Sequence, residues 1–327
     1  MFVPATFSVA LLMTILSTIC WGSFANTFKL TKNYRFELYY WDYAAGIFLI
    51  SLVLALTMGS LRGGDTTFVA NLRDAAPLNL LWATIGGFIF NIANVLLIAG
   101  IEIVGLAIAF PISIGIALVE GVVLSYALQP KGNAALLGGG VAMAVLAVIL
   151  IGMAYGQLQS ASRTVSRKGV AVCIVSGLLM GTFAPFVTRA MTASHPLTPY
   201  TVAFFFTLGA VLCCFVFNIY LMKRPLVGEP IGFAGYRGAP ASYHALGLLG
   251  GVIWGIGTVF NFVAASLVGV AISYAIGQAS PMIAALWGVF VWREFRGSNS
   301  AAKLYLVGMF IAYVLALVLI ARAYQAA

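Results

Sequence analysis

Residues 86–110 read GGFIFNIANVLLIAGIEIVGLAIAF, and residues 250–274 read GGVIWGIGTVFNFVAASLVGVAISY. Each copy opens with a glycine pair, and Val-Gly-X-Ala-Ile-(Ala/Ser)-(Phe/Tyr) begins 17 residues after the second glycine. Every position in one copy therefore has a counterpart 164 residues away, which indicates an internal duplication. Because both copies lie within long apolar runs, the pattern predicts a duplicated membrane bundle, and such bundles often carry a solute site where their halves meet.

The composition excludes an ordinary soluble protein. Of the 327 residues, 62% are hydrophobic and only 8% are charged, and the mean hydropathy is +1.06. A soluble domain of this size could not bury so much apolar surface. Stretches of about 20 apolar residues, which suffice to cross a hydrocarbon core of about 30 Å, occur repeatedly along the chain.

The predicted fold is an all-α integral membrane protein with ten transmembrane helices in two inverted five-helix repeats. The first repeat covers residues 1–157, a polar cytoplasmic linker covers 158–168, and the second repeat covers 169–327. An odd number of spans per repeat requires the inversion. The helices are expected at residues 6–30, 43–59, 77–101, 104–128, 134–157, 169–191, 198–222, 243–267, 269–291 and 301–323. Gly105 and Gly269 are the expected hinges of two equivalent hairpins.

The distribution of cations predicts the orientation in the membrane. Twelve Lys and Arg residues fall in the connections after the odd-numbered helices, against five on the side of the two termini. The first side is therefore predicted to be cytoplasmic, with both termini extracytoplasmic, in a multi-pass protein of the cell inner membrane. Because these cations are spread over short loops, the net charge of +9 does not indicate a nucleic-acid partner.

Several features are interpreted as structural. The four cysteines lie in apolar segments and are predicted to serve in packing, with no disulfide. Pro111 and Pro281 are predicted to break the fourth and ninth helices. Aromatic residues near helix ends are expected to be anchors at the lipid headgroups. They are Tyr34, Phe36, Tyr39, Tyr40, Trp41, Tyr43, Trp287 and Trp292.

A polar stripe occurs twice. Gly87, Asn91 and Asn94 share one face of the third helix, and Gly251, Gly255 and Thr258 are their counterparts in the eighth. An unpaired amide in lipid costs several kcal/mol, so the stripe must face protein or a hydrated cavity. Asn91 and Asn94 would then either bind a polar solute or hold helices together.

Glu120 is the one acidic residue that lies deep in an apolar segment. An ionised carboxylate at mid-membrane costs about 2.5 kcal/mol or more, which favours the protonated form. Glu120 is thus a candidate proton-coupling residue. The alternatives are a neutral acid packed between helices or a position nearer the headgroups. Its counterpart in the second half is Ala284, so any coupling would be asymmetric.

Further polar and aromatic residues complete the candidate site. An amide, hydroxyl and aromatic face suited to hydroxyl-rich solutes is expected from the residues Asn26, Trp254, Thr258, Asn261, Tyr274 and Gln278. Lys29 and Arg189 are candidate gate or mouth residues, although long cationic side chains at helix ends also reach toward the interface without any such role.

No catalytic or cofactor-binding motif is evident. The two histidines, His195 and His244, are far apart, and no phosphate-binding loop or Ser/His/Asp pattern occurs. The sequence therefore disfavours an enzyme and predicts neither cofactor nor metal.

The chain resembles the drug/metabolite transporter superfamily. The resemblance rests on Cys20-Trp21-Gly22-Ser23-Phe24, on the Gly-Gly-X-X-X-Asn run from Gly86 and on the two Val-Gly-X-Ala hairpins. Within the superfamily it is similar to the glucose/ribose porter and ureide permease branch, and more distantly to the rhamnose–proton symporter. Plant ureide permeases carry a long central loop, so the short linker here favours a bacterial relative. The resemblance implies a central cavity lined by helices one, three, four, six, eight and nine, with five and ten as scaffold.

The expected function is secondary active transport of a small polar metabolite by alternating access, with a sugar as the favoured class. The expected partners are the lipid bilayer, the solute and a coupling proton, with sodium as the alternative ion. Other readings are a drug or amino-acid metabolite exporter, a ureide or nucleobase permease, or a structural subunit of a membrane assembly. The last reading predicts a solid interior without a solute-sized cavity.

Overall fold

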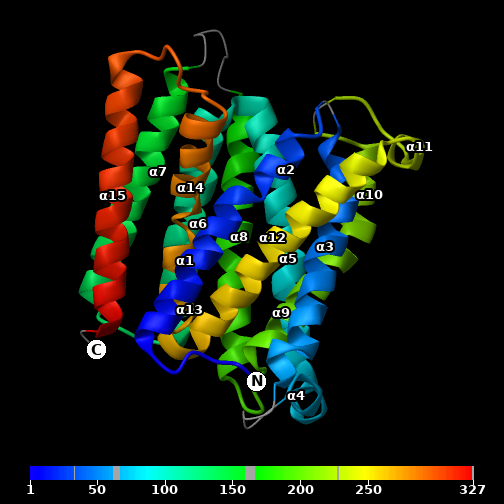
Figure 1. Cartoon of the computed structure of the whole chain (residues 1–327), viewed down its shortest axis with the longest axis vertical. Coiled ribbons are helices and arrows are strands. Elements are labelled where there is room, and N and C mark those ends of the chain that lie inside the picture. The colour runs from blue at the N-terminus through cyan, green and yellow to red at the C-terminus, as the bar shows by residue number, and fades with distance from the viewer. Residues whose placement is uncertain (33, 62–66, 159–165, 227, 326–327) are drawn as a thin grey trace.

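A computed structural model describes residues 1–32, 34–61, 67–158, 166–226 and 228–325. Within these ranges the protein is helical, without a strand, and ten helices are long and apolar enough to cross a membrane. The predicted all-α membrane fold with ten spans is therefore confirmed. Both termini lie at the same end of the bundle (Figure 1).

Several of the ten spans comprise more than one helical element. In chain order they are α1 (Phe7–Ser23) with α2 (Ala25–Lys29), α3 (Phe36–Leu56), α5 (Pro77–Val104), α6 (Leu106–Leu128), α7 (Ala134–Gly156), α8 (Arg167–Thr192), α9 (Pro199–Cys213) with η2 (Cys214–Asn218) and α10 (Ile219–Lys223), α12 (Ala241–Val268), α13 (Val270–Gly277) with α14 (Ser280–Leu286) and η3 (Trp287–Val291), and α15 (Ser300–Gln325). The shorter elements are η1 (Met58–Ser60), α4 (Phe68–Asp74) and α11 (Phe233–Arg237).

Glycine forms the two predicted hairpins. Gly105 joins α5 to α6 with a φ of 81°, and Gly269 joins α12 to α13 with a φ of 86°. Side chains other than glycine rarely adopt this backbone region, so the repeated glycine lets each helix pair reverse within one residue.

The second span begins earlier than predicted. α3 starts at Phe36 rather than at residue 43, so the aromatic run lies inside the helix. Tyr39, Tyr40 and Tyr43 are almost completely buried, and their rings pack on one another, with 5.1 Å between the ring centroids of Tyr40 and Tyr43. The prediction that these three tyrosines anchor the protein at the headgroups is therefore wrong, because a helix begun at Phe36 turns their rings toward other helices.

The two prolines behave differently. α13 ends at Gly277 and α14 begins at Ser280, so the ninth span is broken beside Pro281, which lies in the first turn of α14. α6 continues through Pro111, so the prediction of a broken fourth helix is wrong. A proline inside a helix removes one backbone hydrogen bond and can bend the helix without ending it.

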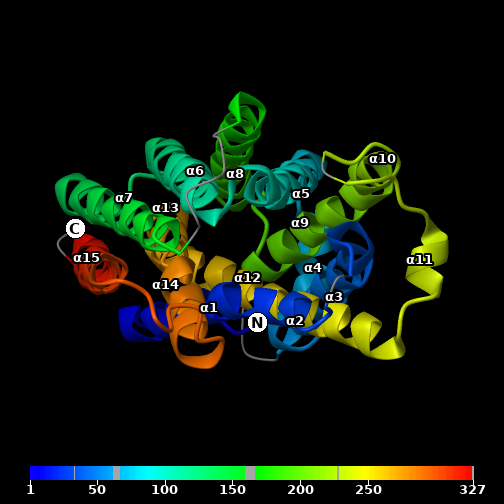
Figure 2. The ribbon, with the colours of Figure 1, turned by 90° about the horizontal axis from the view of Figure 1, so that it is seen from above.

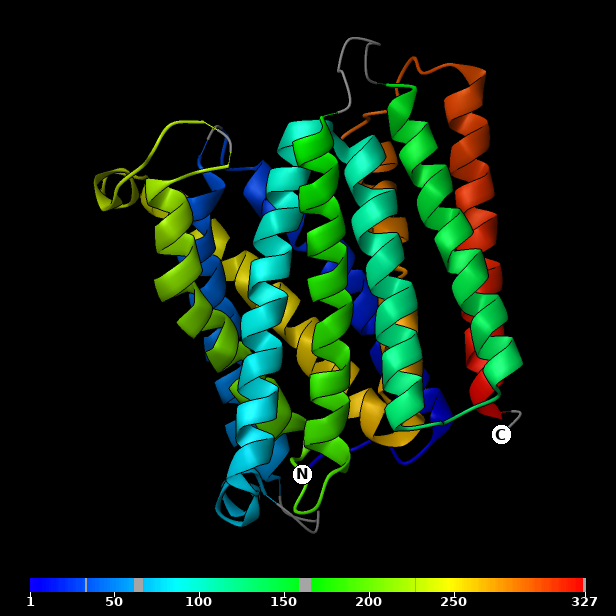
Figure 3. The ribbon, with the colours of Figure 1, turned by 180° about the vertical axis from the view of Figure 1, so that it is seen from behind.

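The helices form two facing groups. α1, α12 and α14 lie along one side, and α5, α6 and α8 lie along the other, as the view along the bundle shows (Figure 2). Seen from behind, α8 lies between α5 and α6, and α7 packs along α15 at one edge (Figure 3). α11 stands apart at the opposite edge (Figure 2).

Glycines permit close helix crossings. A methyl group at Gly251 of α12 would overlap the Tyr43 carbonyl of α3, and one at Gly87 of α5 would overlap the Phe206 carbonyl of α9. Small residues at these points let backbones approach closely, as is common in membrane bundles.

In Figure 1, α5 runs upward and α12 runs downward along the chain. The helices that begin the two copies of the repeated pattern therefore run in opposite directions. The inverted relation of the whole halves, and the boundaries between them, stay predictions. Most of the predicted linker, residues 159–165, lies outside the described residues.

Candidate functional site

A cavity of about 390 Å³ lies between the two groups of helices. It extends from the middle of the bundle to the end at which α7 finishes and α8 begins, which we call the linker end; the end with the chain termini is the terminus end. Phe28, Phe36 and Glu102 line the cavity near the linker end. A volume of this size is typical of small-molecule sites. It also contradicts the solid interior expected of an assembly subunit.

The lining comes mainly from the helices that the family resemblance implied. α1, α5, α6, α8, α12 and the broken span α13–α14 all contribute. α3 and α9, which were not expected, contribute Phe36, Tyr39 and Phe206. Among the described residues α7 and α15 contribute none and pack on each other, as expected for scaffold helices.

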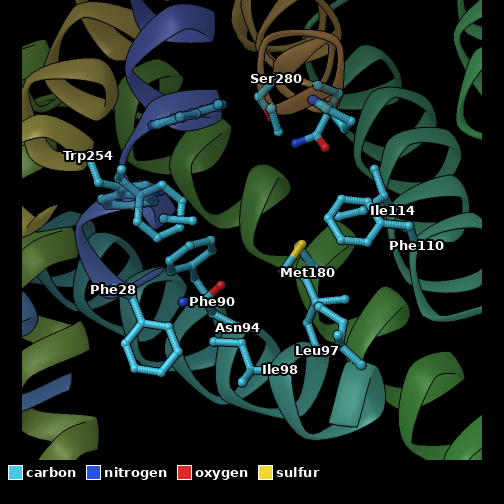
Figure 4. Close-up of a pocket in the computed structure, with 18 of the residues that line it drawn as sticks. Phe28, Phe90, Asn94, Leu97, Ile98, Phe110, Ile114, Met180, Trp254 and Ser280 are labelled. Carbon is cyan, nitrogen blue, oxygen red and sulfur yellow. The ribbon is translucent and has the colours of Figure 1, made fainter. Parts of the chain in front are cut away.

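Aromatic side chains dominate the lining, making up eleven of its 25 residues. Phe90 and Trp254 stack with 4.9 Å between ring centroids and an interplanar angle of 27°, and Trp21 stacks on Trp254 at 6.0 Å. Figure 4 shows Phe90 and Trp254 next to each other at the cavity. Ring faces of this kind can cover the apolar face of a sugar ring or a planar heterocycle.

A few polar groups interrupt this aromatic surface. Asn94 donates a hydrogen bond from Nδ2 to the Tyr40 hydroxyl at 3.2 Å, which leaves its Oδ1 available. The Thr258 hydroxyl accepts from Trp21 Nε1 at 3.1 Å and donates to the Trp254 carbonyl. Gln278 lines the cavity, where its side chain makes no hydrogen bond to the described residues. Asn94, Trp254, Thr258 and Gln278 are thus the predicted binding residues that the structure brings together.

Three other predicted residues, Asn91, Asn261 and Tyr274, are buried beside the cavity and do not line it. The Tyr40 hydroxyl donates to Asn91 Oδ1, and Asn91 Nδ2 points to Cys214 Sγ. Asn261 Nδ2 donates to the Ser273 carbonyl at 2.9 Å. For Asn91 these contacts match the packing alternative left open by the sequence, whereas Asn261 was predicted only as a binding residue.

Tyr274 is also fully buried. Its hydroxyl lies 3.1 Å from the carbonyl oxygen of Ala117 in α6 and 3.4 Å from that of Met180 in α8. A single phenol therefore connects α13 to two helices of the facing group.

Asn26 and Lys29 are engaged near the linker end. Asn26 Oδ1 accepts from Trp292 Nε1 at 2.5 Å. Lys29 forms an ion pair with Glu294 and lies 4.5 Å from the centroid of the Trp292 ring. These contacts tie α2 to the connection after η3. Arg189 is in the last turn of α8, at the terminus end, and is exposed away from the cavity.

Glu120 faces α8 rather than the cavity. Its Oε1 accepts from the Thr182 hydroxyl at 3.0 Å, while Oε2 is buried without a hydrogen-bond partner among the described residues. Gly181 packs directly against its side chain. The carboxyl group therefore lies between α6 and α8.

Glu102 is a lining residue that the sequence did not predict. Among the described residues it is the only charged one that lines the cavity. The charges of Arg35 and Glu37 act on it from the start of α3. Arg35 itself is held by Glu37 at 2.6 and 3.0 Å, and this hydrogen bonding raises the pKa of the Arg35 guanidinium. Extending the stripe of Asn94 by two helical turns, through Ile98 to Glu102, would have found it.

The cavity can therefore hold a small solute by ring stacking and a few hydrogen bonds, with one carboxylate near the linker end. No group of three or more His, Cys, Asp or Glu residues suited to a metal occurs in the part of the chain that the structure describes.

Comparisons with known proteins agree with this arrangement. A family model described as "Sugar transport protein" matches residues 12–322. Ureide permease 1 of Arabidopsis thaliana is 22% identical over 341 residues, which cover 85% of this chain and 86% of the relative. Ureide permease 5 of the same plant is 23% identical, over 94% of this chain and 92% of its own.

A shorter match is to the probable glucose uptake protein GlcU of Staphylococcus aureus, 37% identical over 75 residues, which are 23% of this chain and 26% of that protein. A solved crystal structure matches with a TM-score of 0.65 at 17% identity over 98% of this chain and 99% of its own. At this identity the match shows the shared fold alone.

Proposed function

Because the chain belongs to the sugar transport protein family and is a multi-pass membrane transporter, we propose that it moves a small polar metabolite, with a sugar as the favoured class, by alternating access. The proposed location is a bacterial inner membrane. The proposed chemistry is reversible binding without covalent change, so the protein is not expected to be an enzyme.

The observation that carries this proposal is the cavity between the two groups of helices. Its lining includes Gln278, whose amide makes no hydrogen bond to the described residues, and the stacked rings of Phe90 and Trp254. A sugar needs both kinds of contact, because its hydroxyl groups require hydrogen bonds and its C–H faces pack on aromatic rings. The family description and the GlcU match support a sugar.

The charge distribution supports an orientation for this state. The connections at the linker end carry most of the Lys and Arg residues, so we propose that this end is cytoplasmic and that the termini are extracytoplasmic. The cavity would then face the cytoplasm.

We further propose coupling to a proton. Two carboxylates are candidates for the carrier. Glu120 has a buried oxygen with no hydrogen-bond partner among the described residues, but it does not line the cavity. Glu102 lines the cavity within reach of water at its linker end, and a residue that exchanges protons must be reachable by water. We therefore favour Glu102.

A planar ureide or nucleobase is the second candidate solute. The aromatic share of the lining favours it, because planar heterocycles stack well on rings and pair with amides such as Asn94 and Gln278. Two relatives matched over most of the chain are named as ureide permeases. The same aromatic lining would suit an exporter of drug or amino-acid metabolites.

Thermal unfolding in detergent, with glucose, ribose, allantoin or amino acids added in turn, tests the class of solute. A ligand of the folded protein raises the melting temperature in a concentration-dependent way. Uptake into proteoliposomes with an imposed pH gradient then tests transport. A melting shift with a sugar and its concentrative uptake support the proposal; a shift only with allantoin moves the assignment to a ureide, and no uptake of any bound solute overturns it.

A further inference from the structure

A second pocket of about 340 Å³ lies at the terminus end. Asn71 and Asp74 of α4, Gln129 after α6, Thr198 before α9 and Ser266 of α12 give it a polar lining. No function considered above uses it.

The pocket lies on the same axis as the central cavity, as helical spacing in α12 and α13 shows. In α12, Phe262 lines the cavity and Ser266, four residues on, lines the pocket. Gln278, which directly follows α13, lines the cavity, and Val270, eight residues before it at the start of α13, lines the pocket. Residues four or eight apart share one face of a helix, so each helix presents a single face to both spaces.

In α8 and α9 too, one face of the helix meets both the cavity and the pocket. In α8, Phe183 lines the cavity and Met191 the pocket. In α9, Phe206 lines the cavity and Pro199, seven residues earlier, the pocket. With a rise of 1.5 Å per residue, the two spaces are separated by about 6 Å along α12 and about 12 Å along α8.

Four aromatic residues fill the layer between the two spaces. Phe183 and Phe206 contact each other at a centroid distance of 5.4 Å, and Phe206 and Phe262 do so at 5.4 Å. Phe183 also contacts Tyr274 at 5.6 Å. On the pocket side of Phe183, Val187 of α8 has no exposed surface.

Tyr274 connects this layer to the helices around it. It lies midway between Val270 and Gln278 on the face of α13 that meets both spaces. Its hydroxyl reaches the carbonyl oxygens of Ala117 and Met180, so it holds α13 against α6 and α8. At the linker end the continuation of this span, α14, packs on α1 and α15.

We infer that the terminus-end pocket is the second vestibule of one solute pathway, and that Phe183, Phe206, Phe262 and Tyr274 form the closed gate between it and the central cavity. The inference rests on the proposed function in one respect, that solute passes through the central cavity. Five of the twelve residues that line the vestibule are polar, which suits a hydroxyl- or amide-rich solute. Its Ser266 is also the counterpart, at the offset of 164, of Glu102 near the other mouth.

Cysteine labelling from each membrane face tests the arrangement without any solute. In a Cys20→Ser background, which removes the one native cysteine that is not buried, a membrane-impermeant maleimide is applied to either face of proteoliposomes. Gln325→Cys marks the terminus end and Arg237→Cys the linker end. Ser266→Cys is expected to react from the same face as Gln325→Cys, and Ser280→Cys from the same face as Arg237→Cys. Val187→Cys, buried in α8 between the gate and the vestibule, is expected to react at least about tenfold more slowly than Ser266→Cys.

Tyr274→Phe tests the gate itself. It keeps the ring and removes the hydroxyl, and loss of one hydrogen bond shifts an equilibrium by roughly two- to tenfold. Val187→Cys should then react about two- to tenfold faster from the terminus face. Phe262→Leu, which thins the ring layer, is a second variant with the same expected direction should Tyr274→Phe fold poorly.

Reaction of Ser266→Cys only from the linker face, or equal rates for Val187→Cys and Ser266→Cys, would overturn the inference, as would unchanged labelling in both gate variants. Because no solute is present, these results are independent of the sugar assignment. Failure of uptake with the expected labelling would instead count against the proposed function alone.

Discussion

Phe90 of α5 and Trp254 of α12 stack on each other with 4.9 Å between their ring centroids, and they occupy corresponding positions in the two copies of the repeated pattern, 164 residues apart. Equivalent residues of the two copies therefore contact each other at the cavity through their aromatic rings. One copy adds Asn94 to the lining beside this contact, and the other adds Thr258 at the corresponding position. Neither copy alone provides the site.

The ring pair is expected to contribute to solute affinity. Phe90→Leu or Trp254→Leu should weaken binding of the solute by about two- to tenfold, because an aromatic contact contributes about 0.5–1.5 kcal/mol beyond its buried area. Isothermal titration in detergent measures this. Phe204→Leu is the matched control, since Phe204 packs against Phe48 and Phe68 outside the cavity. Equal affinities in the wild type and both cavity variants would contradict the prediction.

The two buried amides of the second half should separate binding from folding. Gln278→Leu removes an amide with no protein partner among the described residues, so solute affinity should fall by about two- to tenfold with little loss of stability. Asn261→Leu leaves the Ser273 carbonyl without its donor and should cost about 1–3 kcal/mol of stability. Melting curves with and without solute give both quantities; the reverse pattern would show that Asn261, not Gln278, binds the solute.

Coupling should depend on Glu102. In proteoliposomes, Glu102→Gln is expected to abolish concentrative uptake driven by an inward proton gradient while exchange of labelled for unlabelled solute continues, because the glutamine cannot carry a proton. Glu120→Gln should retain gradient-driven uptake. If Glu120→Gln loses coupling and Glu102→Gln keeps it, the proton carrier is Glu120 and not Glu102.

Glycine packing between α3 and α12 should be essential. Gly251→Ala would force apart the backbones at Tyr43 and should lower stability by about 1–3 kcal/mol, as overpacking does. At Gly138 in α7 an added methyl group meets no atom within 4 Å. Gly138→Ala should therefore be neutral or stabilising by up to about 1 kcal/mol. Urea or thermal unfolding that gives equal effects for the two variants would rule out the close crossing.

Patterns that repeat along the chain predicted the fold well. Apolar length identified the ten spans, and the Val-Gly-X-Ala motif identified the hairpins at Gly105 and Gly269. Predictions from single residues were wrong where contacts between helices determine the structure. The tyrosines of α3 look like headgroup anchors in sequence, yet the rings of neighbouring helices bury them. Pro111 has the sequence signal of a break, yet α6 continues through it.

The candidate site was predicted in part, for a related reason. Polarity within an apolar helix identified Asn94, Thr258 and Gln278, which line the cavity. Polarity alone could not distinguish these residues from Asn91 and Asn261. All are polar residues in apolar helices, and only the structure shows which of them are bonded to other protein groups. Glu102 escaped notice because an acid near a helix end is unremarkable until the neighbouring helices enclose it.

The central claim, that both copies enclose one solute site, is tested most directly by solute protection. In the Cys20→Ser background, Asn94→Cys and Gln278→Cys are each treated with a hydrophilic thiol reagent, in the presence and absence of the sugar or ureide that gives the largest melting shift. Both cysteines are expected to react from the linker face, and the solute should slow both reactions at least about tenfold when it saturates the site. Reaction from opposite faces, or protection of one cysteine without the other, would contradict a single site shared by the two halves.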